Sequence, residues 1–159
     1  MPVIKRILCP VDFSDTAALG AREAAALARA AGAELMLVHA LSEPWLSTRE
    51  ERGYPARIAQ QYEMIAQKKL NDAARVLGAT VTVRTLLVHG AADEVVANAA
   101  TKHSADLIVM GTRARAGLAR LLADSMTERV MKRARVPVVR VCPSVQRQSP
   151  LGSAAHGAA

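Results

Sequence analysis

The chain has 159 residues, of which 51% are hydrophobic and 22% charged, so it should form one domain with a sizeable core rather than a disordered chain. The formal net charge is +7, and residues 112–135 alone carry seven basic and two acidic side chains. This cluster indicates a phosphate ligand, nucleic acid, an anionic surface or a solvated helix face, although an aromatic content of 3% argues against stacking on single strands.

Apolar runs and the residues that end them predict the elements in order. The first strand is expected over residues 4–11, and Ser14 is then a suitable N-cap for a helix that runs to residue 31 and ends at Gly32. The next expected elements are a strand over 34–41, a loop over 42–56, a helix from about 57 to 77, a strand over 80–88, a helix over 93–102 and a strand over 106–110. A helix over 125–135 and a strand over 136–141 complete a domain of residues 1–142, and residues 143–159 are expected to form a flexible tail.

Strands and helices thus alternate along the whole domain, and the strands are nearly continuous apolar runs. This alternation predicts a parallel sheet with right-handed crossovers and helices on both faces. We expect an α/β fold of three layers, a doubly wound, Rossmann-like, five-stranded parallel sheet with the strand order 3-2-1-4-5. Ligands bind such folds beyond the carboxyl ends of the strands, where the strand order reverses. Those ends carry Pro10-Val11-Asp12, His39-Ala40, His89-Gly90 and Met110-Gly111.

Several short motifs lie at or near these strand ends. They are Pro10-Val11-Asp12-Phe13-Ser14, Val38-His39, Val109-Met110-Gly111-Thr112-Arg113, Gly117-Leu118, Arg120-Leu121-Leu122, Ser125 and Val136-Pro137-Val138-Val139. Through these motifs, taken in this order over residues 3–142, the chain resembles the universal stress protein family of the adenine nucleotide alpha hydrolase-like superfamily. The resemblance implies a role in the stress response and a homodimer formed by antiparallel pairing of the strand Val136–Val141.

The ATP-binding branch of that family carries a loop of the form G-x2-G-x9-G-S/T, whose glycines let backbone N–H groups approach phosphate oxygens. Gly111 and Ser125 fit its first and last positions, whereas Ala114 and Asp124 replace the other two glycines. The methyl group of Ala114 costs about 1 kcal/mol if that position requires a positive φ. The Asp124 carboxylate would repel a phosphate about 4 Å away by about 4 kcal/mol at an effective dielectric constant of about 20.

Asp12 is the most suggestive single residue, because the resemblance implies that its carboxylate binds ribose hydroxyls or the adenine amine. Its alternative role is to cap the following helix. The expected cofactor-binding residues are Pro10, Val11, Asp12, Ala40, Met110, Gly111, Arg113, Ala114, Ser125 and Met126. The expected ligand is ATP or another adenine nucleotide with Mg²⁺, bound weakly because of Ala114 and Asp124 unless Arg113, Arg115 and Arg120 compensate.

The other reactive side chains point to no catalytic group. Cys9 and Cys142 lie in apolar runs without a CxxC partner, which indicates a reducing compartment, no metal site and a core position for Cys9. His39 and His89 end strands, and we expect them to be satisfied or partly exposed there. The N-terminus does not resemble a signal peptide and no apolar run could span a bilayer, so we expect a soluble, cytoplasmic protein with no membrane partner.

These observations favour a non-enzymatic homodimer of the universal stress type that responds to an adenine nucleotide. The alternative is a slow ATPase or autokinase, for which Asp12 and Asp124 are the candidate base and Mg²⁺ ligand. Nucleic-acid binding through the arginines of 113–135 is disfavoured, because no helix-turn-helix or stacking platform is evident. A flavodoxin-like FMN carrier is disfavoured as well, because no phosphate loop rich in Ser, Thr and Gly follows the first strand.

Overall fold

The computed structural model describes residues 3–42, 56–112 and 125–143. Its elements are β1 (Arg6–Pro10), α1 (Asp15–Ala31), β2 (Glu34–Leu41), α2 (Ala56–Leu77), β3 (Val83–His89), α3 (Ala92–Lys102), β4 (Leu107–Gly111), α4 (Met126–Arg133) and β5 (Val138–Val141). Their type and order are as predicted. The expected tail beyond residue 143 and the expected loop over 43–55 lie outside the described residues.

Several element ends differ from the prediction by one to three residues. β1 spans 6–10 instead of 4–11, and β3 spans 83–89 instead of 80–88. Ser125 is the N-cap of α4 rather than its first residue, and the helix ends at Arg133 because the backbone of Ala134 is extended. β5 begins at Val138 rather than at residue 136, because Pro137 has no N–H to donate to the ladder. The last strand therefore has four residues.

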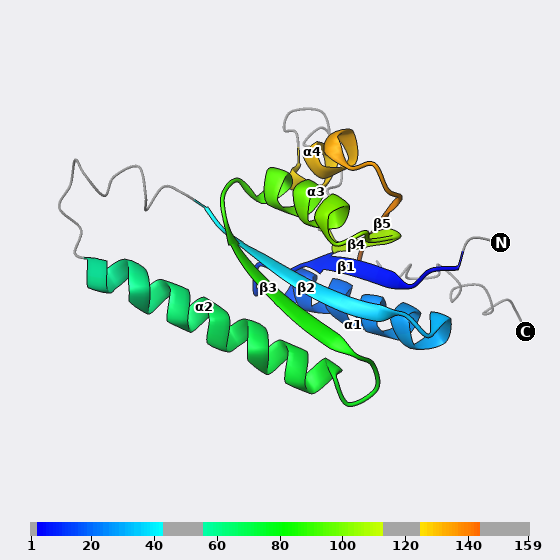
Figure 1. The fold of residues 1–159 in the computed structure, drawn as a ribbon, viewed down its shortest axis with the longest axis horizontal. Helices are drawn as coiled ribbons and strands as arrows, with labels where there is room; N and C mark the ends of the chain where they lie inside the picture. Colours follow the sequence, from blue (N-terminus) through cyan, green and yellow to red (C-terminus); the bar gives the residue numbers. More distant parts are fainter. Residues whose placement is uncertain (1–2, 43–55, 113–124, 144–159) are drawn as a thin grey trace, which may run out of the picture.

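The five strands form one parallel sheet in the order β3-β2-β1-β4-β5, which confirms the predicted topology. β1 lies in the centre, with β2 on one side and β4 on the other. Because the chain continues from β1 to β2 and places β4 only later, the strand order reverses between β1 and β4. α1 and α2 cover one face of the sheet, and α3 and α4 cover the other (Figure 1).

The side chains of successive residues in the central strands point to opposite faces of the sheet. Ile7 and Cys9 belong to the core under α1 and α2, whereas Leu8 and Met110 belong to the core under α3 and α4. Strands buried on both faces need apolar side chains at every position, which explains their continuous apolar runs. Cys9 is fully buried, as expected.

α1 approaches the sheet closely because its buried side consists of alanines and one glycine, namely Ala17, Gly20, Ala21, Ala24, Ala25 and Ala28. A Cβ atom on Gly20 would overlap the backbone of Gly111 at the end of β4. A Cβ atom on Gly111 would in turn overlap the carbonyl oxygen of Thr16. Gly111 is therefore required for helix packing, and this contact fixes the end of β4 against the first turn of α1.

α2 packs on the sheet mainly through its C-terminal half. Leu70 is fully buried there, whereas Tyr62 and Ile65 continue the same apolar spacing but are 50% and 52% exposed. The N-terminal half of the helix projects past the edge of the sheet (Figure 1). Within the described ranges, no helix has both the length and the apolar character that a bilayer span requires.

Candidate functional site

A cleft of about 790 Å³ lies at the carboxyl ends of β1, β2 and β4, and the first turns of α1, α3 and α4 complete its walls. It occupies the place where the strand order reverses, as expected for a doubly wound sheet. Seven of the expected site residues line it together: Pro10, Val11, Asp12, Ala40, Gly111, Ser125 and Met126.

The other three expected residues are not among the described residues that line the cleft. Met110 is 3% exposed and packs in the core under α3 and α4, so it is not among the residues that line the cleft. Arg113 and Ala114 lie outside the described residues, as does Asp124. The central part of the expected phosphate loop therefore remains a prediction.

The turn between β1 and α1 holds Asp12 at the mouth of the cleft. Its Oδ1 accepts hydrogen bonds from the backbone N–H of Ser14 at 2.9 Å and from the Ser14 hydroxyl at 2.5 Å. The Ser14 Oγ accepts from the N–H of Ala17 and caps α1. Asp12 is thus not the cap but supports it. The residue is exposed and lines the cleft, and no hydrogen bond among the described residues uses its Oδ2.

His39 and Phe13 brace the same turn, although neither was among the expected site residues. Phe13 adopts a φ of 64°, a strained value for a bulky side chain, and its ring lies 4.4 Å from that of His39. The His39 Nδ1 lies 2.7 Å from the carbonyl oxygen of Val11. Because a carbonyl oxygen only accepts, Nδ1 carries a proton and Nε2 of the neutral ring is an acceptor. His39 also lines the cleft.

The first turn of α4 forms the opposite wall. Ser125 and Glu128 form a capping box, in which the Ser125 Oγ accepts from the Glu128 N–H and the Glu128 carboxylate accepts from the Ser125 N–H. Two further N–H groups of this turn, those of Met126 and Thr127, have no acceptor among the described residues. Unpaired N–H groups at a helix N-terminus favour an anion.

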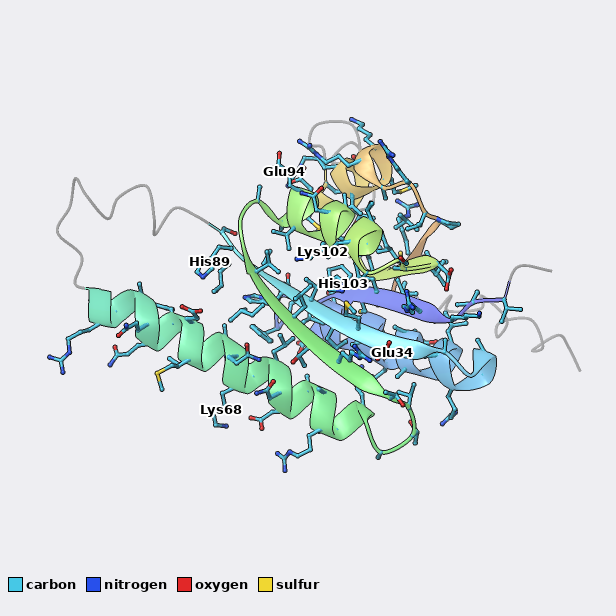
Figure 2. The ribbon with its side chains drawn as sticks, in the orientation of Figure 1. Glu34, Lys68, His89, Glu94, Lys102 and His103 are labelled. Atoms are coloured by element: carbon cyan, nitrogen blue, oxygen red, sulfur yellow. The ribbon has the colours of Figure 1, made fainter. Side chains whose placement is uncertain are left out.

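Sequence reasoning missed several other lining residues, among them Thr16, Ser42, Thr112, Glu128, Arg140 and Cys142. Ser42 directly follows a predicted strand and Thr112 lies two residues after another, so their position after a strand end could have identified them. The position of Arg140 depends on how β5 aligns with β4, which the sequence pattern does not give. His89 does not line the cleft: it lies at the end of β3 near α2, with its Nε2 3.8 Å from Glu63 (Figure 2).

Several reactive side chains at and near the cleft are hydrogen-bonded or buried. The carboxylates of Asp12 and Glu128 both already accept hydrogen bonds. Burial raises the pKa of the Cys9 thiol to about 12, so this thiol is no nucleophile. The described residues contain no group of three side chains suited to hold a metal ion.

A model of the universal stress protein family (Usp) matches residues 4–141. The chain belongs to the universal stress protein family. Universal stress protein MJ0531 of Methanocaldococcus jannaschii is 31% identical over 140 residues, which cover 86% of this chain and 81% of that protein. The universal stress protein in the QAH/OAS sulfhydrylase 3′ region of Thermus aquaticus is 34% identical over 139 residues, or 87% and 99% of the two chains.

Solved structures of universal stress proteins share the fold. Protein MJ0577 of Methanocaldococcus jannaschii superposes with a TM-score of 0.73 at 24% identity, covering 91% of this chain and 99% of that one. A universal stress protein in complex with cAMP has a TM-score of 0.69 at 19% identity, with coverages of 88% and 98%. The universal stress protein from Archaeoglobus fulgidus in complex with dAMP has a TM-score of 0.62 at 24% identity, with coverages of 87% and 98%.

Proposed function

We propose that this universal stress protein binds an adenine nucleotide in the cleft at the ends of β1, β2 and β4, and that it is a non-enzymatic regulator of the stress response. The observation that carries the proposal is the gathering of seven expected residues around one cleft at the reversal of strand order. The cAMP and dAMP complexes of two structural relatives support an adenine nucleotide as the ligand class.

In this proposal the adenosine lies between β2 and β1. Ala40 is a small residue that leaves room for the base, and the His39 Nε2 and the free oxygen of Asp12 accept hydrogen bonds from amine or hydroxyl groups. The phosphates lie at the first turn of α4, where the N–H groups of Met126 and Thr127 donate to them. Mg²⁺ would accompany the phosphates.

The non-enzymatic part of the proposal is supported by the state of the acidic side chains. Asp12 and Glu128 are the two carboxylates among the described lining residues, and each is held by a backbone N–H group. Each of these carboxylates thus already has a structural task at the start of a helix, which leaves it less free to activate water or a hydroxyl group. Phosphate release from Mg-ATP by the purified protein would instead support the slow ATPase or autokinase.

We further propose a homodimer formed by β5, the free edge strand of the sheet. The carbonyl oxygens of Pro137 and Val141 bond to Ile108 and Thr112, so the backbone groups of the intervening Val138 and Arg140 point away from β4. An unpaired edge of this kind favours pairing with a second copy. The cytoplasmic location likewise remains a prediction.

The binding proposal is tested by calorimetric titration of ATP, ADP, AMP and adenosine in the presence of Mg²⁺, with guanosine as the specificity control. We expect binding of the adenine compounds and about tenfold weaker binding in Asp12→Asn, which keeps the turn but loses the charge-assisted bond. Asp15→Asn is the matched control, because Asp15 is exposed in the same segment but does not line the cleft. No binding of any adenine compound would refute the proposal.

A further inference from the structure

Arg140 is the one lysine or arginine among the described residues that line the cleft. Two carboxylates, those of Asp12 and Glu128, line the same cleft. A polyphosphate placed there would meet more negative than positive side-chain charge from the rest of these residues. Among the described lining residues, Arg140 is therefore the side chain that can stabilise additional phosphate groups by its charge.

The register of the sheet shows which way Arg140 points. Its partner on β4 is Met110, whose side chain lies in the core under α3 and α4. Val138, two residues earlier on β5, contributes to the same core. Because residues at even spacing share one face of a sheet, Arg140 projects to the face on which α4 begins.

The order of the strands then arranges the cleft as a row. Four neighbouring strands each supply one of the following residues. Ala40 lies in β2, Asp12 comes after β1, Gly111 ends β4 and Arg140 lies in β5, and the strands β2, β1, β4 and β5 are consecutive in the sheet. Neighbouring strands lie about 4.8 Å apart, so a monophosphate held over β4 ends about one strand spacing short of β5. A second or third phosphate extends in the direction of Arg140.

Arg140 also has no role within the described fold. It is exposed, it stands alone among the valines of β5, and none of the described residues forms a hydrogen bond or ion pair with its guanidinium. A charge on an edge strand has one general purpose, which is to discourage aggregation. That purpose requires no position at a cleft, whereas a phosphate at the cleft can use both the charge and the planar fork of arginine.

We propose that Arg140 binds the terminal phosphates of the nucleotide, so that the cleft prefers adenosine di- and triphosphates to the monophosphate and the nucleoside. This inference rests on the proposed nucleotide-binding function. It is compatible with the proposed dimer, because strand pairing uses backbone groups in the plane of the sheet and the Arg140 side chain projects out of that plane.

The test is a calorimetric titration of adenosine, AMP, ADP and ATP into four proteins: the wild type, Arg140→Gln, Arg140→Lys and Arg135→Gln. The last is the matched control, because Arg135 is an exposed arginine near the same face that does not line the cleft. We expect the wild type to bind ATP and ADP more tightly than AMP. Arg140→Gln should weaken ATP and ADP binding about tenfold and leave adenosine unchanged, with Arg140→Lys in between and Arg135→Gln like the wild type.

Each outcome distinguishes this inference from the function on which it rests. If the wild type binds none of the four ligands, the proposed function fails and the inference fails with it. If the wild type binds ATP and Arg140→Gln binds it equally well, only the assignment of Arg140 is overturned. Equal weakening of ATP and adenosine would also overturn it, because Arg140 would then act on the shape of the cleft rather than on the phosphates.

Discussion

At the scale of single residues, Ala114 and Asp124 are the two positions that depart from the G-x2-G-x9-G-S/T loop implied by the family resemblance. We predict that the double substitution Ala114→Gly with Asp124→Gly raises ATP affinity at least about tenfold, because it removes a repulsion of about 4 kcal/mol at close approach. Calorimetry with Mg-ATP measures the effect, and adenosine, which has no phosphate, is the control ligand. Equal ATP affinity in the two proteins would mean that the Asp124 carboxylate points away from the phosphates.

The two thiols differ in a way that chemical labelling can detect. Cys9 is fully buried with its pKa raised to about 12, whereas Cys142 is exposed and lines the cleft. At pH 8 we expect iodoacetamide to modify Cys142 and spare Cys9, because only the thiolate reacts and reagent must reach it. Mass spectrometry of the digested protein measures both sites, and labelling in denaturant is the control. A saturating nucleotide should slow the labelling of Cys142, and equal labelling of both thiols in the native protein would contradict the prediction.

At the scale of elements, the capping box of Ser125 and Glu128 fixes the start of α4, an eight-residue helix. We predict that Ser125→Ala lowers the free energy of unfolding by about 1 kcal/mol, because it removes the acceptor for the Glu128 N–H. Ser125→Thr, which keeps a hydroxyl acceptor, should lose much less. Urea denaturation followed by circular dichroism compares the three proteins, and equal losses in both variants would assign the effect to packing instead.

The contact between α1 and β4 gives a prediction in which the usual sign is reversed. In a free helix, glycine to alanine is stabilising by about 1 kcal/mol. Gly20→Ala should instead destabilise this protein by about 1–3 kcal/mol or more, because the new methyl group overlaps the backbone of Gly111. Ala18→Gly on the exposed side of α1 is the control and should cost about 1 kcal/mol through propensity alone. A stabilised Gly20→Ala protein would contradict the close contact.

Most of the fold follows from local rules, whereas part of the site does not. The predicted caps at Ser14 and Gly32 are confirmed, since a side-chain acceptor or a left-handed glycine acts within one turn. The bond between His39 and Val11 joins residues 28 positions apart, and the approach of Arg140 to the cleft depends on pairing between β4 and β5. Such contacts depend on register and tertiary packing, which a single sequence pattern does not specify.

At the scale of the whole molecule, Asp106 joins the starts of β4 and β1 at the end of the sheet opposite the cleft. Its Oδ2 accepts from the N–H groups of Lys5 and Arg6, and these bonds hold the pKa of its carboxyl below the ordinary value. A lowered pKa in the folded state means that the carboxylate stabilises the fold above the unfolded pKa, near pH 4, and that this contribution is lost as the pH falls through the folded value.

We therefore predict that Asp106→Ala lowers the free energy of unfolding at pH 7 by about 1 kcal/mol, a value already reduced for the exposure of this side chain. The difference from the wild type should shrink steadily below about pH 4, since both proteins then lack the charged acceptor. Asp72→Ala is the control, because the ion pairs that its carboxylate forms with described residues are to the exposed Lys68 and Arg75 and should contribute little. Urea titrations between about pH 2.5 and about pH 7 span these pKa values and measure the difference in the free energy of unfolding. A difference that stays constant over this range would contradict the role of the Asp106 carboxylate.

The proposed dimer is tested at the free edge of β5. The backbone groups of Val138 and Arg140 point outward, and we place the two-fold axis of the proposed dimer at Val139, where Val138 of one protomer pairs with Arg140 of the other. This register sets the two Val139 side chains opposite each other. Val139 is 39% exposed, and Val139→Lys would bring two like charges together across the axis, which is destabilising for a strand pair.

By light scattering after size exclusion we expect the wild type at twice the chain mass of 16.9 kDa and Val139→Lys at the mass of one chain. Val3→Lys, at an exposed position outside β5, should remain a dimer. A dimer that persists in Val139→Lys would place the interface on a different surface, whereas a wild-type monomer would refute the pairing of β5.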